Sequence, residues 1–445
     1  MNNVIISQHI EKELQAAIQR ISPDRLFVLT DSTTLTACWP VISTFPCLGA
    51  VCGGLSAASV PVVPAPPASD SSPLEPASAS SPLKPASASS PLEPASASSP
   101  LKPASASSPL EPVSASSPLE PASASSPLEP ASASSSQALV RGGFPAAKMI
   151  TIPPTDEAKT LDSLSAVWTA LSEGGATRHS LLINLGGGMV TDLGGFAAST
   201  FKRGIAYINL PTTLLAMVDA SVGGKTGINF RGLKNEIGVF NAADTVILDT
   251  HFLRTLDMQN LRSGYAEMVK HGLISNTQHL AELLTFDLDR LDYARLQQLV
   301  GESVAVKQRI VEEDPHEHGI RKALNLGHTA GHAFESLAMA EGRTVLHGYA
   351  VAWGLVCELY LSATRCGFPV QLLRQVTQFV RETYGQFLFD CKQYDRLYEL
   401  MTHDKKNTAG HINFTLLADV GDIRINQTAS RDDVFEMLDF YREGN

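Results

Sequence analysis

A nine-residue repeat limits how much of this 445-residue chain can fold. The unit Ser-Pro-Leu-Glu/Lys-Pro-Ala-Ser-Ala-Ser occurs seven times between Ser72 and Ser134. Two prolines in each unit remove backbone donors and fix φ, and the small side chains cannot bury enough area to offset the entropy of ordering. Residues 46–143 are therefore predicted to form a disordered Pro/Ser/Ala insertion with polyproline character. About 340 residues remain, which suits a two-domain enzyme.

The repeat itself allows two functional interpretations. Pro73-Leu74-Glu75-Pro76 fits the PxxP pattern of peptides that bind partner domains. The other interpretation is a tolerated expansion of a surface loop, because long loops add little closure entropy. We favour the loop expansion. A nonapeptide β-helix is excluded because the units lack its Gly and Asp turns.

Charge and composition exclude several classes of protein. The net charge is −11, of which the repeats contribute −3 through five glutamates and two lysines. A chain with this net charge does not show the broad basic surface of a nucleic-acid binder. Residues 1–20 have no apolar signal core, and no stretch approaches the ~20 apolar residues of a membrane span. The six cysteines form no CxxC pair. We therefore expect a cytoplasmic protein with reduced, buried thiols and no membrane or nucleic-acid partner.

Strands alternate with helices in the first foldable part of the chain. Apolar runs predict strands at 26–31, 180–185, 206–210 and 245–249, and a helical period spans 160–174. Such alternation is typical of a parallel, doubly wound sheet with helices on both faces. The α/β domain is expected to comprise residues 1–45 and 144–250.

Helical periods dominate the rest of the chain. They run through 261–274, 279–284, 296–311, 328–338 and 349–366. A short hairpin-like segment follows at 412–417. Residues 251–445 are thus predicted to form a mostly α-helical domain.

Two glycine motifs fall where strands give way to other elements. Gly186-Gly187-Gly188, followed by Asp192, lets a backbone approach a pyrophosphate at a helix N-terminus. It is not a GxGxxG motif, so a tight strand–helix turn is the other interpretation. Residues 222–226, which include Lys225, resemble half a P-loop but lack its upstream glycine. We reject an ATPase for that reason.

Metal-ligand residue types share helix faces in the second half. Glu267 and His271 lie on one face of the helix expected at 263–272, and His328 and His332 are four residues apart on another. A carboxylate and two imidazoles suit a catalytic zinc ion. Spacing alone nominates both His328 and His332 as ligands. Three further histidines compete with them: His271, His347 and His403.

Basic residues cluster beside the same motifs in this acidic protein. Such clusters suggest capture of a phosphate and a carboxylate, whereas solvated surface charge is the alternative for some of them. The residues are Arg203, Lys225, Lys234, Lys270, Lys307, Arg321, Lys405 and Lys406.

Seven ordered segments together resemble 3-dehydroquinate synthase, a family of sugar-phosphate cyclases. They include NLGGGMVTDLGG from residue 184, PTTLLAMVDASVGGKTGIN from 211, SGYAEMVKHGLI from 263, LNLGHTAGHAFES from 324 and HDKKN from 403. The resemblance covers essentially the whole chain outside the insertion. It implies a Rossmann-like NAD-binding N-terminal domain, a helical C-terminal domain that binds metal and substrate, and a homodimer.

The resemblance also implies roles for individual residues. Glu267, His328 and His347 would hold Zn²⁺ or Co²⁺, which makes His332 a proton-handling residue beside the substrate instead of a ligand. Contacts with NAD⁺ would come from Asp31, Asp156, Lys159, Gly187, Gly188, Asp192, Thr212, Thr213, Lys225, Lys234 and Thr255. Contacts with the substrate would come from Arg203, Asp219, Lys225, Asn235, Lys270, Lys307, Arg321, Asn325, His332 and Lys405.

One position departs from the family pattern, and another leaves a choice between two adjacent lysines. Asp156 stands where the family commonly has a longer glutamate, so Glu157 is an alternative contact to the cofactor. Lys406 is the alternative to Lys405 as a contact with the substrate.

The reaction implied is the second step of the shikimate pathway. It converts 3-deoxy-D-arabino-heptulosonate 7-phosphate to 3-dehydroquinate by transient oxidation, phosphate β-elimination, reduction and an intramolecular aldol. Three alternatives remain: another sugar-phosphate cyclase, a metal-dependent polyol dehydrogenase, and a catalytically inactive scaffold. The carboxylate-binding set Arg321, Asn325 and Lys405 favours the synthase over the first.

Overall fold

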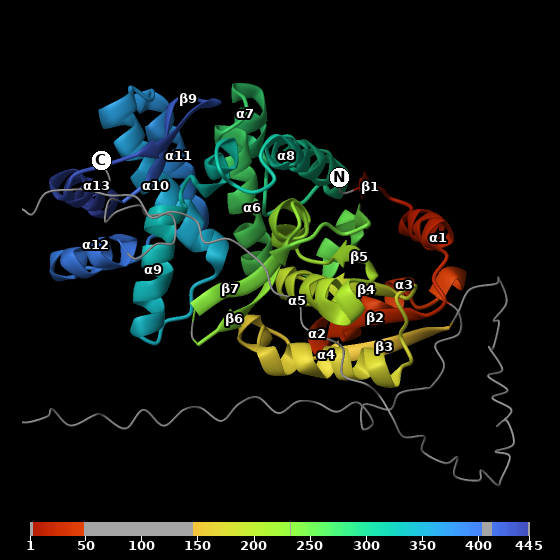
Figure 1. Cartoon of the computed structure of the whole chain (residues 1–445). Coiled ribbons are helices and arrows are strands. Elements are labelled where there is room, and N and C mark those ends of the chain that lie inside the picture. The colour runs from red at the N-terminus through yellow and green to blue at the C-terminus, as the bar shows by residue number, and fades with distance from the viewer. Residues whose placement is uncertain (1–2, 49–145, 232, 403–411, 444–445) are drawn as a thin grey trace, which may run out of the picture. The chain divides into compact units, whose positions relative to one another are not determined.

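The computed structural model describes residues 3–48, 146–231, 233–402 and 412–443 (Figure 1). The predicted insertion at 46–143 lies almost entirely outside these residues, and so do Cys52, His403, Lys405 and Lys406. Within the described parts of the chain, no helix is long and apolar enough to cross a membrane.

A six-stranded sheet organises the first half of the protein. The strands lie in the order β1-β8-β5-β4-β2-β3, and every neighbouring pair is parallel. Every residue of β2 and β4 is buried, as expected when helices cover both faces of a parallel sheet. The predicted parallel sheet is confirmed. Its strands are β1 (Asn3–Ile6), β2 (Leu26–Asp31), β3 (Ala147–Ile152), β4 (Leu181–Gly186), β5 (Ala206–Pro211) and β8 (Thr245–Leu248).

The strand order reverses between β2 and β4. From β2 the chain continues to β3 on one side, and from β4 it continues to β5 and then β8 on the other. Ligands of open parallel sheets bind at the carboxyl ends of the strands beside such a reversal. Asp31 and Gly186 end the two strands concerned. The helices of this half are α1 (Ile10–Ile21), α2 (Ser32–Ala37), α3 (Trp39–Ile42), α4 (Leu161–Glu173) and α5 (Gly188–Thr200).

A two-stranded antiparallel hairpin, which the sequence analysis did not predict, follows β5. It consists of β6 (Lys225–Phe230) and β7 (Leu233–Phe240). The hairpin packs on α5 and runs toward α9 in Figure 1. It therefore carries Lys225 and Lys234 to the helical half, where they pair with Glu317 and Glu335.

The second half of the protein is mostly helical, as predicted. Helix α6 contacts α7, α8 and α10, and α10 also packs on α9, α11 and α13. The hairpin-like segment is the start of an antiparallel pair, β9 (Phe414–Asp419) and β10 (Asp422–Gln427). The helices are α6 (Met258–Leu273), α7 (Thr277–Thr285), α8 (Tyr293–Glu313), α9 (His328–Ala340), α10 (His347–Cys366), α11 (Val370–Tyr384), α12 (Tyr394–Thr402) and α13 (Arg431–Glu443). The division into domains at residue 250 stays a prediction.

The five described cysteines form no disulfide with one another. Cys38, Cys47 and Cys357 are buried, and burial raises the pKa of each thiol. Cys391, however, is exposed, so the expectation of buried thiols was wrong for that residue. It stands at the start of a single helical turn, Cys391–Gln393, where no core element covers it.

Candidate active site

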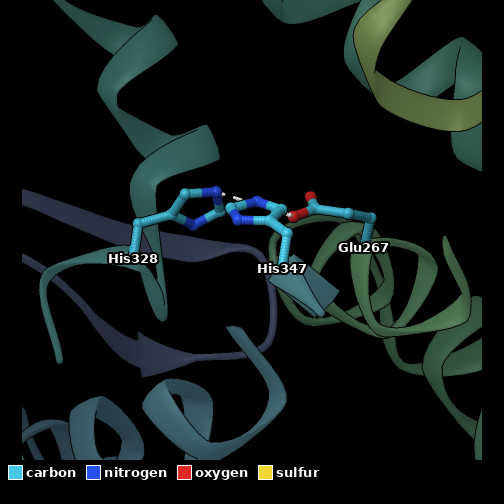
Figure 2. Close-up of side chains that lie close together, drawn as sticks. All are labelled: Glu267, His328 and His347. Atoms are coloured by element: carbon cyan, nitrogen blue, oxygen red, sulfur yellow. Dashed lines mark ion pairs between the residues drawn. The ribbon is translucent and has the colours of Figure 1, made fainter. Parts of the chain in front are cut away.

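Glu267, His328 and His347 converge from three helices (Figure 2). Oε1 of Glu267 lies 3.5 Å from Nε2 of His328 and 3.5 Å from Nε2 of His347. Glu267 is fully buried in the middle of α6, and each histidine is the first residue of its helix. Oε1 has no hydrogen-bond donor among the described residues. A buried carboxylate oxygen facing two imidazole nitrogens fits the donor set of a divalent metal.

The second nitrogen of each imidazole also has an oxygen neighbour. Nδ1 of His328 lies 3.1 Å from the backbone oxygen of Leu326, and Nδ1 of His347 lies 3.3 Å from Oε2 of Glu335. A proton on Nδ1 leaves the lone pair of a neutral imidazole on Nε2. Both rings therefore present a metal-binding nitrogen toward Glu267.

Two glycines let these helices approach one another. A Cβ on Gly348 would lie 1.8 Å from the backbone oxygen of Ser263, so only glycine allows the first turn of α10 to touch α6. Gly327 precedes α9 with φ +79°, a conformation that favours glycine. The sequence motifs around His328 and His347 thus have a packing reason as well as a chemical one.

Two ion pairs, one buried and one partly buried, adjoin the three converging residues. Lys270 pairs with Glu267, and Nζ of Lys307 lies 2.5 Å from Oδ1 of Asp219, a residue of the short helical turn η4 (Ala216–Ala220). Burial opposes ionisation of both carboxyl groups, but Lys307 lowers the pKa of Asp219 and Lys270 lowers that of Glu267. Both carboxylates are therefore charged at neutral pH.

His271 is buried beside the same groups. Burial, followed by the charge of Lys270, lowers the pKa of His271 to about 3. Its ring is therefore neutral at pH 7, and its donor atoms lie within 4.8 Å of those of Glu267 and Asp219.

Glu335 links the converging residues to the β6–β7 hairpin. Its Oε1 lies 3.1 Å from Nζ of Lys234, and its Oε2 faces His347. Burial opposes ionisation of Glu335, but the neighbouring His347 lowers its pKa. Burial likewise favours neutral His347, yet Glu335 raises the pKa of that imidazole to about 10, so a metal ion that binds Nε2 displaces a proton from it.

His332, which spacing alone nominated as a ligand, lies beside the three converging residues. Its ring centroid is 5.4 Å from that of His328 and 6.0 Å from that of His347. Its donor atoms form a separate group with those of Glu335 and His347. The structure thus brings together the ligand set that the resemblance implied, with His332 next to it. The ligand roles stay predictions.

A third group surrounds Glu317 at the junction of the two halves. Lys225 pairs with one of its carboxylate oxygens, and Nδ2 of Asn325 donates to the other at 2.8 Å. Arg321 is buried and donates to the backbone oxygens of Pro315, at 2.5 Å, and Gly223, at 3.0 Å. Cationic and amide donors implied as substrate contacts therefore meet in one place.

The carboxyl edge of the sheet gathers most of the residues implied as cofactor contacts. Lys159 is buried and pairs with Asp192 of α5, and it also donates to Asn235 of β7. Helix α5 starts at Gly188, capped by Gly187, and the amide of Thr212 donates to the backbone oxygen of Gly186 at 2.9 Å. Helical N-termini attract phosphate groups, so this edge is suited to a dinucleotide.

The remaining cofactor-side residues lie near the same edge. Asp31 caps α2 by accepting hydrogen bonds from the amides of Thr33 and Thr34, each at 2.9 Å. Thr213 caps the turn at Ala216, and Oγ1 of Thr255 lies 3.7 Å from Sγ of Cys38.

The choice between Asp156 and Glu157 stays open. Both are exposed on a short turn, Asp156–Ala158. Oδ2 of Asp156 accepts from Asn229 at 3.3 Å and lies 4.0 Å from Nζ of Lys234. A hydrogen bond from Thr155 lowers the pKa of Glu157.

Arg203 is not brought into any of these groups. It is exposed in the short turn Phe201–Arg203 and forms no ion pair with another residue in the described ranges. Lys405 and Lys406 lie outside those ranges, so the choice between them stays open.

Three carboxylates of these groups were missed by the sequence analysis: Glu317, Glu335 and Glu358. Glu335 lies seven residues after His328, and Glu358 lies eleven after His347, so each shares a helix face with a converging histidine. That spacing was a usable signal.

The chain is similar in sequence to a known family of enzymes. Residues 149–263 match the family model of the 3-dehydroquinate synthase N-terminal region, and residues 264–407 match that of the C-terminal region. A 3-dehydroquinate synthase of Parabacteroides distasonis is 60% identical over 300 residues, which are 67% of this chain and 85% of that protein. One of Oceanobacillus iheyensis is 43% identical over 285 residues, 63% of this chain and 78% of the relative.

Solved structures with the same fold include two cyclases. The 2-epi-5-epi-valiolone synthase ValA of Streptomyces hygroscopicus subsp. jinggangensis, with NAD⁺ and Zn²⁺ bound, is 25% identical with a TM-score of 0.59, covering 67% of this chain and 84% of its own. A 2-deoxy-scyllo-inosose synthase, complexed with carbaglucose-6-phosphate, NAD⁺ and Co²⁺, is 24% identical with a TM-score of 0.58, covering 67% and 84%.

Proposed function

The chain belongs to the 3-dehydroquinate synthase family, and on that premise we propose that it converts 3-deoxy-D-arabino-heptulosonate 7-phosphate to 3-dehydroquinate and phosphate. It is an NAD- and metal-dependent enzyme of the lyase type. The observation that carries the proposal is the convergence of Glu267, His328 and His347 beside buried lysines, next to the cofactor-binding edge of a parallel sheet.

The residues present fit both cofactors. The Oε1 atom of Glu267 and the Nε2 atoms of the two histidines would hold Zn²⁺ or Co²⁺. The edge formed by Asp31, Gly187 and the start of α5 would hold NAD⁺. When bound, NAD⁺ supplies a reversible hydride acceptor and the metal supplies a Lewis acid for an alcohol oxygen.

The protein's own groups would fix the substrate at both anionic ends. Lys225, Arg321 and Asn325 lie together near Glu317, while Lys270 and Lys307 lie together near Asp219. Ammonium and guanidinium groups gathered in this way can hold a phosphate and a carboxylate. Holding both ends would orient the reacting atoms of the substrate for the steps that precede phosphate release.

His332 is proposed as the residue that moves a proton at the substrate. Its ring lies beside those of His328 and His347 without sharing the Glu267 group. An imidazole is a side chain that can both accept and donate a proton in catalysis. A homodimer and a cytoplasmic location belong to the same proposal, as expected for the family.

The test is phosphate release from 3-deoxy-D-arabino-heptulosonate 7-phosphate by the purified full-length protein. We expect release that requires both NAD⁺ and metal, with 3-dehydroquinate formed in equal amount. Release should stop in the presence of a chelator and return when Zn²⁺ or Co²⁺ is added.

The competing function is another sugar-phosphate cyclase, because two structural neighbours are cyclases named for other products. Glucose 6-phosphate and sedoheptulose 7-phosphate should be assayed in parallel, since neither carries a carboxylate. Turnover of either in place of the acid would reject the proposed substrate. Folded protein that takes up no metal would instead favour an inactive scaffold.

A further inference from the structure

The carboxylate of Glu335 stands between a histidine of the metal site and a lysine of the cofactor side. Oε2 lies 3.3 Å from Nδ1 of His347, and Oε1 lies 3.1 Å from Nζ of Lys234. The Glu335 side chain is only 12% exposed, whereas that of Lys234 is 55% exposed. Glu335 therefore uses its two oxygens on two different structural elements.

The contact with His347 determines which nitrogen of that imidazole faces Glu267. Nε2 points to Oε1 of Glu267 at 3.5 Å, while Nδ1 points to Glu335. A carboxylate at Nδ1 holds the proton there, fixes the ring orientation and leaves the lone pair on Nε2. Without Glu335 the ring would lose both its tautomer preference and one of its two anchors.

The contact with Lys234 reaches the hairpin. Lys234 is the second residue of β7, and its neighbour Asn235 accepts a hydrogen bond from Lys159. Lys159 in turn pairs with Asp192 on α5, the helix that starts at the cofactor edge. A continuous chain of polar contacts thus leads from His347 through Glu335 and β7 to α5.

We propose that Glu335 is a positioning residue that orients His347 for the metal and, through Lys234, couples metal binding to dinucleotide binding. This inference rests on the metal and cofactor sites of the proposed function. Coupling between two sites is reciprocal, so metal should tighten NAD⁺ binding by the same factor by which NAD⁺ tightens metal binding.

The first measurement is metal affinity without substrate. Zn²⁺ is titrated against a chelating dye, and the visible absorption of the Co²⁺-loaded protein is recorded. Loss of a carboxylate behind a histidine ligand typically costs 10–100-fold in metal affinity, so we expect that loss and an altered Co²⁺ spectrum in Glu335→Leu. Glu341→Leu is the control, because Glu341 is the C-cap residue of the same helix α9 and pairs with a basic residue, Arg343, but touches no ligand.

The second measurement is the ratio of NAD⁺ dissociation constants with and without saturating Zn²⁺. We expect a ratio of about 5-fold or more in the wild type, and a ratio near one in Glu335→Gln. The amide of that variant still offers an oxygen to Nδ1 but lacks the charge that holds Lys234. The Glu335→Gln variant should therefore keep a metal affinity closer to that of the wild type while it loses the coupling. A merely structural role of Glu335 would not separate these two effects.

Wild-type metal affinity in Glu335→Leu, or wild-type coupling in Glu335→Gln, would overturn the inference. The isosteric glutamine variant keeps the test open if the leucine variant fails to fold. Wild-type protein that binds no metal would reject the proposed metal site instead, so the two failures are distinguishable without any turnover assay.

Discussion

The carboxylate of Glu358 accepts a hydrogen bond from the backbone amide of Gly327 at 2.6 Å. Its other oxygen accepts from the amides of Thr329 and Ala330 at 2.9 and 3.2 Å. Glu358 is fully buried on α10, and these amides belong to the start of α9. The helix that begins with His347 therefore caps the helix that begins with the other converging histidine.

We expect Glu358→Ala to lower the free energy of unfolding by about 3 kcal/mol. The reason is that buried helix-terminal amides lose a charged acceptor and cannot reach water. Urea denaturation of the metal-free protein measures the change. Glu313→Ala, which removes an exposed carboxylate at the end of α8, should stay within about 0.5 kcal/mol of the wild type. Equal stabilities for the two variants would contradict the capping role.

His347→Ala should abolish metal-dependent turnover and leave less than a tenth of the wild-type metal content. Removing one of three donors leaves a carboxylate and a single imidazole, which hold a divalent ion poorly. Metal content is measured by emission spectroscopy after dialysis. His332→Ala is the comparison variant, with metal retained and rate reduced about 10²–10⁴-fold, because general acid–base groups contribute that much. A His347→Ala protein with normal metal content and rate would disprove the ligand assignment.

Removal of the metal should lower the melting temperature of the wild type but not that of His347→Ala. A ligand bound only by the folded state adds roughly 4 kcal/mol when present at 1,000 times its dissociation constant. Calorimetry with and without a chelator measures the shift, with Zn²⁺ added back as the control. An equal shift in both proteins would mean that the ion stabilises the chain at another place.

The parallel sheet could be predicted because continuous apolar runs such as residues 26–31 are buried on both faces. The β6–β7 hairpin could not be predicted by the same route. Most residues of β7 are exposed, so no alternation of apolar and polar residues marks it. Strand β1 was missed because four residues at the sheet edge, none of them buried, give no periodic signal.

Residue types at the candidate site could be predicted from local spacing, but their grouping was predicted only through the family resemblance. Helical spacing placed His328 beside His332, whereas the structure places His328 and His347 around Glu267. That arrangement depends on α10 packing against α6 at Gly348, a tertiary contact without a local sequence period. The pairing of Lys307 with Asp219 likewise joins residues 88 positions apart.

Stability should fall in acid partly through Asp314, which holds the loop before Arg321. Its carboxylate accepts from the amides of His318, Gly319 and Arg321 at 3.0, 2.7 and 3.1 Å. Burial opposes ionisation slightly, but these hydrogen bonds lower the pKa of Asp314. A folded pKa below the unfolded value of about 3.9 stabilises the protein above that pH, and the contribution is lost as the pH falls through the folded pKa.

Asp314→Asn should therefore be less stable than the wild type at pH 7, and the difference should shrink as the pH falls below about 4. Urea denaturation at pH 7, 5 and 3.5 measures the trend. The variant should also raise the KM for the substrate, because Arg321 lies in the same loop. A difference in stability that grows on acidification would contradict the sign of the shift.

Removal of the seven repeats, residues 72–134, should leave activity and metal binding unchanged. For the flexible insertion that the sequence predicts, shortening by about threefold alters the closure free energy by only ~1 kcal/mol, in the stabilising direction. Phosphate release and urea denaturation of the deletion variant are compared with those of the full chain. A deletion of the same type that also removed residues 147–152 would take away β3 and should unfold the sheet edge, which makes it a control for loss of structure. Loss of activity in the repeat deletion alone would mean that the PxxP segments act in the catalytic assembly, since loop entropy cannot account for such a change.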